Sequence, residues 1–153
     1  MSRILSRKLS QIERPAVVAN LRNPEMFFVD LRLRDQMKGG RIPALNWINI
    51  PIHELDDFFN SNTLDNCAEF ARRFDAPAPT AEQTIVFYCL CGVEARPAAA
   101  LWENRMQNRE VMYYQGGWFD WNEDWEWKEW KKWILDVKFG RALLSDEFLK
   151  KLG

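Results

Sequence analysis

The residues best suited to chemistry in this sequence surround Cys89. The apolar run from Ile85 to Cys89 is typical of a strand that is buried on both faces. A short loop containing Gly92 follows, and the pattern predicts a helix from Pro97 to Met106. The N–H groups and dipole at a helix start favour negative charge, so we expect a lowered pKa and a nucleophilic thiolate at Cys89. The competing interpretation is a small apolar residue at the end of a strand.

Three neighbours of Cys89 bear on this chemistry. The carboxylate of Glu94 would repel an anionic substrate and raise the pKa of Cys89. The guanidinium of Arg96 would offset that effect only if it pointed toward the cysteine. Cys91 is either a resolving thiol or a small residue that fills the loop. A disulfide across one intervening residue would be strained, which favours the second interpretation.

The elements that must position these residues alternate along the chain. Strands are expected at 27–32, 47–52, 85–89 and 111–114, and helices at 15–21, 63–74 and 97–106. This alternation predicts an α/β fold with a parallel sheet flanked by helices. In such sheets ligands bind outside the carboxyl ends of the strands, which is where Cys89 lies.

Composition excludes several classes of protein. The 153 residues suit one domain, and the net charge of −1 lacks the basic footprint of a general nucleic-acid binder. The longest uncharged run, from Ile42 to His53, is too short and too polar for a transmembrane helix. Three cysteines do not make a disulfide framework, so a reducing compartment is expected. The single histidine argues against a metal site or a His-based triad, and we expect no cofactor.

Five short motifs, taken in order, resemble the rhodanese-like domain. They are Asp30-Leu31-Arg32, Gly40-Arg41-Ile42-Pro43, Ile50-Pro51, Cys89-Leu90-Cys91-Gly92-Val93 and Gln115-Gly116-Gly117-Trp118 continuing to Trp121. The resemblance covers about residues 15–122. It implies a rhodanese fold, with Cys89 as a persulfide-forming cysteine held by the N–H groups of its loop. Gly92, Val93 and Ala95 match loop positions of sulfurtransferases in that family. The implied partners are a sulfur donor and a thiol acceptor.

The sequence also departs from the family pattern. Arg41 replaces the histidine of the second motif, and Leu90 and Glu94 stand at loop positions that are often basic or hydroxylated. A phosphatase is disfavoured, because six residues rather than five separate Cys89 from Arg96. We expect Asp30 and Arg32 to form a structural pair and His53 to lie at the surface. Two functions remain open: a sulfurtransferase that carries a persulfide on Cys89, and a non-catalytic accessory subunit of a larger protein assembly.

The chain divides into a basic extension at 1–13, the rhodanese-like domain at 14–122 and a tryptophan-rich tail at 123–153. The N-terminal segment resembles a mitochondrial presequence, but Leu5, Leu9 and Ile12 equally suit an ordinary amphipathic helix, so a mitochondrial and a cytoplasmic location both remain open. A capping box at Asp120 predicts the start of a tail helix. One face of that helix carries Trp127, Trp130, Trp133 and Ile134, which favours a protein partner.

Overall fold

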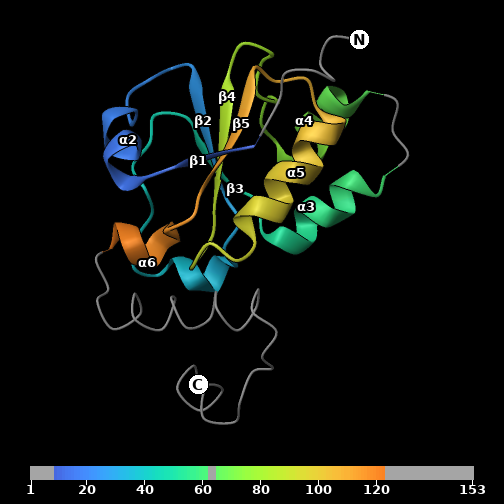
Figure 1. Ribbon diagram of the computed structural model, residues 1–153. Coiled ribbons are helices and arrows are strands. Elements are labelled where there is room, and N and C mark those ends of the chain that lie inside the picture. The colour runs from blue at the N-terminus through green and yellow to red at the C-terminus, as the bar shows by residue number, and fades with distance from the viewer. Residues whose placement is uncertain (1–8, 62–64, 123–153) are drawn as a thin grey trace, which may run out of the picture.

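A single parallel sheet forms the centre of the protein in a computed structural model, which describes residues 9–61 and 65–122 (Figure 1). Its five strands are β1 (Ser10–Ile12), β2 (Met26–Asp30), β3 (Trp47–Asn49), β4 (Thr84–Tyr88) and β5 (Glu110–Tyr114). They lie in the order β1-β5-β4-β2-β3, and every neighbouring pair is parallel. The predicted parallel α/β fold is therefore confirmed, with β4 in the middle of the sheet.

Helices cover both faces of this sheet (Figure 1). The helices are α2 (Arg14–Ala19), α3 (Ile52–Phe59), α4 (Asn66–Phe74), α5 (Ala95–Arg105) and α6 (Gly117–Trp121), with a 3₁₀ turn η1 (Arg34–Met37). The side chains of α3, α4 and α5 join the core on one face, and those of α2 and α6 pack on the other. Parallel strands need such crossover connections, because a tight turn cannot join their ends.

The alternation of side chains along β4 decides which core each residue enters. Ile85 and Phe87 join the core under α3, α4 and α5, whereas Val86 and Tyr88 join the core under α2. All five residues of β4 are buried, as the apolar run predicted. Cys89 continues the same period of two and enters the core of Ile85 and Phe87.

Three local predictions are wrong. Leu9 and Ile12 do not share a helix face, because Ser10–Ile12 forms β1, which pairs with β5 and buries Ile12. Asp120 does not cap a tail helix, since it lies inside α6. The strand expected at 47–52 ends at Asn49, and His53 falls in α3 instead. The predicted surface position of His53 is correct, because its side chain is exposed.

The predicted features at the two ends of the chain lie outside the described residues. These are the presequence-like residues before Leu9 and the tail face of Trp127, Trp130, Trp133 and Ile134. They stay predictions. None of the helices in the described ranges combines the length and apolar character needed to cross a bilayer.

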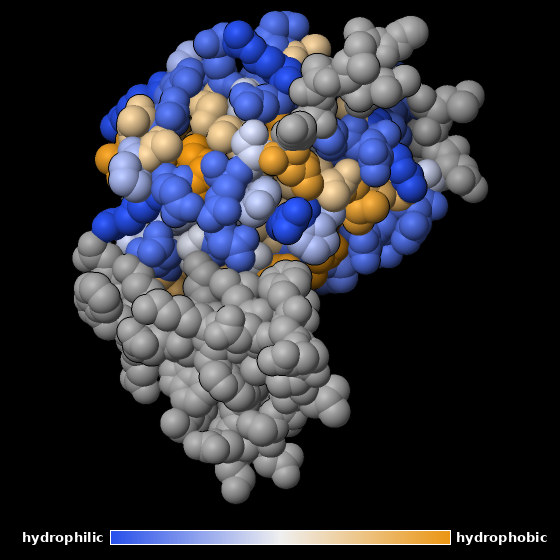
Figure 2. Space-filling view, viewed as in Figure 1, coloured by the Kyte–Doolittle hydropathy of each residue, from blue (hydrophilic) through white to orange (hydrophobic). Residues whose placement is uncertain are grey.

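Large apolar side chains at the described surface are dispersed rather than clustered. The most exposed are Val18, Leu33, Leu45 and Leu101, which lie on different elements. The face drawn in Figure 2 shows hydrophobic patches interspersed with hydrophilic side chains. Dispersed apolar residues of this kind are normal at a soluble surface and do not mark an interface.

Candidate active site

Cys89 begins the loop that joins the central strand β4 to helix α5. Two hydrogen bonds tie this loop to the start of α6: the Trp118 amide donates to the Cys89 carbonyl at 2.9 Å, and the Phe119 amide donates to the Leu90 carbonyl at 3.1 Å. Gly117 makes this approach feasible, because a Cβ there would lie 2.6 Å from the Cys89 carbonyl oxygen. The backbone that follows β5 therefore holds the cysteine loop in place through these two hydrogen bonds.

The loop directs backbone N–H groups at the cysteine sulfur. The Gly92 amide donates to Sγ of Cys89 at 3.0 Å, and the Glu94 amide donates to it at 3.4 Å. Gly92 has φ of +87°, and a Cβ there would lie 1.9 Å from the Gln115 carbonyl oxygen. Only glycine fits both the conformation and the space. This curl of the backbone forms a cradle suited to a sulfur anion, which is the geometry that the sequence predicted for Gly92.

The acidity of Cys89 is the opposite of the one expected from its place before a helix. Burial raises the pKa of the Cys89 thiol to about 11, and this effect exceeds all others. The Glu94 and Cys91 amides lower the pKa, whereas the negative charges of Cys91 and Glu94 raise it. The side chain is only 3% exposed, so the thiolate loses most of its hydration. Two N–H donors do not replace the hydration that burial removes.

The predicted pair of Asp30 and Arg32 is present and fully buried. The guanidinium of Arg32 donates to both carboxylate oxygens of Asp30, at 2.8 Å from Nη2 to Oδ2 and 3.0 Å from Nε to Oδ1. Both side chains have an exposed fraction of 0%. Arg32 also donates to the carbonyls of Gln36 and Gly40, at 3.2 and 2.8 Å. The pair therefore ties η1 and the loop after it to the end of β2.

Trp118 connects this buried pair to the cysteine loop. The guanidinium carbon of Arg32 lies 4.5 Å from the centre of the Trp118 ring, and the Trp118 amide holds the Cys89 carbonyl. A cation over an aromatic face is attractive, particularly where water is excluded. The sequence did not predict this contact. The closing glycine-tryptophan motif marked Trp118, but nothing in its spacing told which residue the ring would meet.

Tyr88, the last residue of β4, was also missed as part of the site. Its hydroxyl oxygen accepts hydrogen bonds from Trp47 Nε1 at 2.8 Å and from the Ile42 amide at 3.3 Å. Burial and the nearby Asp30 carboxylate raise the pKa of Tyr88 well above its usual value. Tyr88 therefore remains a neutral hydroxyl. It holds the segment around Ile42 against the sheet.

The arginines of the predicted site are occupied away from the cysteine sulfur. Arg96 is exposed, and its guanidinium carbon lies 5.9 Å from the centre of the Tyr113 ring. Arg41 stacks 4.3 Å from the centre of the Trp47 ring at the edge of the sheet. Neither guanidinium is among the largest influences on the pKa of Cys89.

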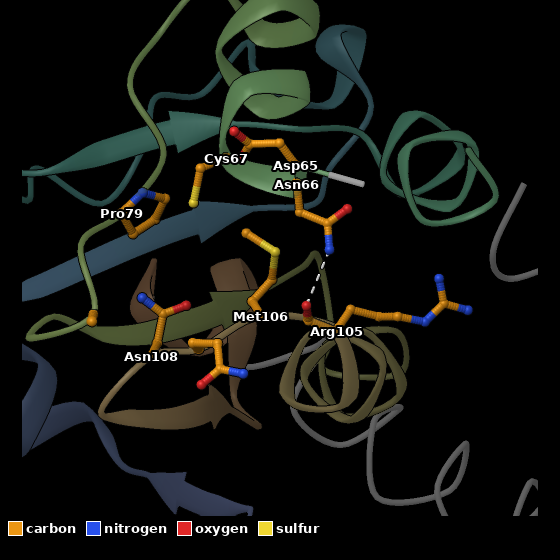
Figure 3. A pocket seen from close by; sticks show the side chains of 9 residues that line it. Asp65, Asn66, Cys67, Pro79, Arg105, Met106 and Asn108 are labelled. Carbon is orange, nitrogen blue, oxygen red and sulfur yellow. Dashed lines mark hydrogen bonds between the residues drawn. The ribbon is translucent and has the colours of Figure 1, made fainter. Parts of the chain in front are cut away.

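The side chains of the other loop residues are less buried than that of Cys89. Leu90, Cys91 and Val93 are half-buried, and Glu94 is exposed. Cys67 lies elsewhere, at the start of α4, on a hollow of about 550 Å³ that also contacts the chain before β4 and after α5. Figure 3 shows Cys67 and Met106 at this hollow, with the Asn66 side chain donating to the Arg105 carbonyl at 3.2 Å. Cys67 is therefore an exposed thiol outside the cysteine loop.

The described residues contain no cluster of three or more His, Cys, Asp or Glu side chains that would hold a metal ion. The chemistry that the arrangement itself offers is that of a buried sulfur nucleophile in a backbone cradle. The Gly92 and Glu94 groups that donate hydrogen bonds to the sulfur are both backbone amides.

Comparison with known proteins gives one consistent family. The model of the rhodanese-like domain matches residues 14–124. A curated mouse relative, thiosulfate sulfurtransferase/rhodanese-like domain-containing protein 3, is 28% identical over 102 residues. That match covers 66% of this chain and 60% of the relative, so the chain spans about three fifths of the relative's length.

Solved structures show the same fold. The human single-domain sulfurtransferase TSTD1 superposes with a TM-score of 0.60 at 24% identity, over 76% of this chain and 97% of that one. The single-domain sulfurtransferase RDL2 of Saccharomyces cerevisiae gives 0.62 at 20% identity, over 78% and 94% of the two chains. At these identities the likeness establishes the fold alone.

Proposed function

The chain belongs to the rhodanese-like domain family, and on that premise we propose that it is a sulfurtransferase that carries a persulfide on Cys89. The observation that carries the proposal is the cradle: the Gly92 and Glu94 amides both donate to Sγ of Cys89. Such converging N–H groups favour negative charge on sulfur at the end of a parallel strand. The two single-domain sulfurtransferases with this fold support the same reaction class.

In the proposed reaction the Cys89 thiolate attacks the sulfane sulfur of a donor. A new S–S bond forms at Sγ, and the bond between the sulfane sulfur and the rest of the donor breaks. The leaving group departs with the electron pair of that bond, so that Cys89 becomes a persulfide anion. A thiol or cyanide acceptor then attacks the outer sulfur, and Sγ leaves as the thiolate. Each step is a nucleophilic displacement at sulfur and needs no external oxidant or reductant.

The loop contributes geometry more than acidity to these steps. Gly92 and Glu94 hold their amides at the sulfur before a donor arrives, so little reorganisation is needed when charge develops there. Burial raises the pKa of Cys89 to about 11, so the thiolate is a minor form near neutral pH. The transfer rate is therefore expected to rise with pH through the range in which the thiolate fraction grows.

Cyanolysis tests this function. The full chain is incubated with a sulfur donor, freed of excess donor, and treated with cyanide, and thiocyanate is then measured. One equivalent of thiocyanate is expected from the native chain and from Cys67→Ser, which removes only the exposed thiol of α4. No thiocyanate is expected from Cys89→Ser. Equal release from native chain and Cys89→Ser, or no release from either, would overturn the proposal.

A second function is favoured by one observation, the burial that raises the pKa of Cys89 to about 11. Buried cysteines of high pKa are commonly inert. The alternative is thus a non-catalytic accessory subunit that binds a larger assembly through Trp127, Trp130, Trp133 and Ile134, all outside the described residues. Size-exclusion chromatography with light scattering separates the two functions, because a monomeric chain that is active in cyanolysis supports the sulfurtransferase. For both functions we propose a reducing compartment, mitochondrial or cytoplasmic, because all three cysteines are free.

A further inference from the structure

Two backbone amides at the start of α6 fix the direction of two successive peptide units in the cysteine loop. The Trp118 amide donates to the Cys89 carbonyl at 2.9 Å, and the Phe119 amide donates to the Leu90 carbonyl at 3.1 Å. The peptide bonds of the described residues are all trans, and in a planar trans peptide the N–H points opposite to the C=O. The hydrogen bond from Phe119 therefore turns the Cys91 N–H to the opposite side of its peptide. That N–H is one of the two amides that lower the pKa of Cys89.

The start of α6 is held by a buried tryptophan ring rather than by a capping side chain. Gly116, which precedes the helix, makes no side-chain cap, whereas the Trp118 side chain is only 8% exposed. The guanidinium carbon of Arg32 lies 4.5 Å from the centre of this ring. A Cβ built on Gly39 or on Gly40 would lie 3.6 Å from a ring carbon, so the ring packs next to the backbone of the loop after η1.

The guanidinium that meets the ring has a fixed position of its own. Arg32 donates to the Asp30 carboxylate and to the carbonyls of Gln36 and Gly40, at 2.8, 3.2 and 2.8 Å. These hydrogen bonds use the edges of the planar group and leave its face for the ring of Trp118. The attraction between a cation and an aromatic face is strongest where both are desolvated, as they are here.

We propose that Trp118 is a positioning residue for sulfur transfer, because its ring on Arg32 fixes the start of α6 and thereby the orientation of the cysteine loop. The inference rests on the proposed function and adds a residue that acts through the loop instead of on the reacting sulfur. During persulfide formation the negative charge moves to the outer sulfur, and amides that already point there stabilise it without reorganisation. Loss of the ring releases the two carbonyls that keep the loop in that orientation.

Two reactions of the same thiolate separate positioning from reactivity. Thiosulfate transfers its sulfane sulfur to Cys89 and sulfite leaves with the electron pair of the broken bond, so the product is a persulfide anion. Methanethiosulfonate gives the same persulfide, and methanesulfinate leaves. Iodoacetamide forms a carbon–sulfur bond at Cys89 and iodide leaves, so the product is a neutral thioether. The ratio of persulfidation rate to alkylation rate at one pH therefore cancels the thiolate fraction and keeps the contribution of the oriented amides.

The experiment measures both rates at Cys89 by peptide mass spectrometry in single-turnover reactions of the full chain, over a range of donor concentrations. Trp118→Leu removes the ring, and we expect it to lower the ratio at saturating donor about tenfold while the half-saturating donor concentration stays the same. Trp118→Phe keeps a smaller aromatic face on Arg32 and should lower the ratio only about threefold. Val17→Ala is the matched control, because Val17 is fully buried in the core on the other face of the sheet, and its ratio should stay at the native value.

Far-UV circular dichroism and urea unfolding establish that each variant is folded under the assay conditions. Trp118→Met, a second variant without a ring, replaces Trp118→Leu if that chain does not fold, and Trp118→Phe decides the question if neither folds. A native ratio in a folded variant without the ring, or in Trp118→Phe where it stands alone, overturns the inference and leaves the sulfurtransferase standing. An equal fall in Val17→Ala also overturns it, because lost stability would then explain the effect. Failure of both donors to persulfidate the native chain overturns the sulfurtransferase and the inference with it.

Discussion

Raising the pH is expected to increase the alkylation rate of Cys89 about tenfold for each unit between roughly pH 7 and pH 10, without a plateau in that range. Only the thiolate reacts, and burial raises the pKa of Cys89 to about 11. The thiolate fraction therefore keeps growing until the pH approaches that value. A cysteine activated by a helix start would instead reach its plateau well below pH 8.

The magnitude follows from the burial of the sulfur. With a pKa of about 11, roughly one Cys89 in ten thousand is ionised at pH 7, whereas an ordinary cysteine is ionised to a few per cent. Alkylation at pH 7 should therefore be about 300-fold slower than at an ordinary thiol, before any steric shielding is counted. The Glu94 and Cys91 amides already contribute to this value, so the deficit is what remains after their hydrogen bonds have acted.

The assay must report Cys89 separately from the exposed thiol of Cys67 at the start of α4. Iodoacetamide labelling of Cys91→Ser, resolved by peptide mass spectrometry, distinguishes the Cys89 peptide from the Cys67 peptide in one sample. Near-UV circular dichroism at each pH confirms that the fold persists. Loss of that signal at a given pH would attribute the labelling there to unfolding and not to the acidity of Cys89.

A Cys89 plateau at or below pH 8.5, with the fold intact, would refute the reasoning. It would mean that the two amides and the helix start stabilise the thiolate by more than burial destabilises it. The sequence-based expectation of a lowered pKa would then be correct after all. A slope that continues to pH 10 supports the view that the cradle positions the sulfur without making it acidic.

Three further outcomes follow from the contacts around the site. Gly92→Ala should lower the free energy of unfolding, measured in urea, by about 2 kcal/mol or more, because Gly92 has a positive φ and the new Cβ would meet the Gln115 carbonyl. Gly39→Ala is the control and should cost far less, because its new Cβ would lie at ordinary contact distance from Trp118. Asp30→Asn should cost about 3–5 kcal/mol in the same assay, since it leaves the Arg32 charge buried and unpaired, and adding Arg32→Met should recover part of that loss. Hydrogen bonds from Arg72 and Arg73 lower the pKa of Glu69 to about 2. The stability that Glu69 contributes is therefore present above its ordinary pKa and is lost as the pH falls toward 2. Glu69→Gln should flatten this part of the pH profile of thermal unfolding.

The strands and helices that the sequence predicted are those with a complete local pattern. The β4 run contains only residues that suit a buried strand, and α4 has an aspartate cap whose carboxylate accepts the Ala68 amide at 3.0 Å. Strand β1, which the sequence did not predict, lacks such a pattern. β1 is three residues long and becomes a strand only because β5 offers it an edge to pair with. That pairing joins residues about a hundred positions apart, and no periodicity in a local window records it.

Helix α3 was missed for a different reason. Leu55, Phe58 and Phe59 have helical spacing and all three are buried, but the apolar run from Trp47 extends to Ile52 and predicted a longer strand. Pro51 ends that strand, because proline has no amide to continue the sheet, and α3 begins directly after it. The pattern for a helix was therefore present, and the error lay in where the strand was taken to end.

The candidate site likewise combines residues that the sequence predicted with features that it did not predict. The cysteine, its glycine and the Asp30–Arg32 pair were predicted, because each depends on residue types at fixed spacing. The direction of the shift in the pKa of Cys89 was not, because it depends on how completely α5 and the neighbouring strands exclude water from the sulfur. The ring of Trp118 over Arg32 was missed for a related reason, since it joins two loops that are far apart in the chain.

The shape of the cysteine loop and the reactivity of its cysteine have separate physical causes. The shape depends on Gly92 and Gly117, where a Cβ would collide with the Gln115 and Cys89 carbonyls. The reactivity depends on burial and on the charge of the Glu94 side chain, and neither alters the path of the backbone. A glycine motif therefore specifies the cradle without specifying what the cradle does. Because burial is the largest cause of the raised pKa, replacing Glu94 alone should change the acidity of the Cys89 thiol only slightly.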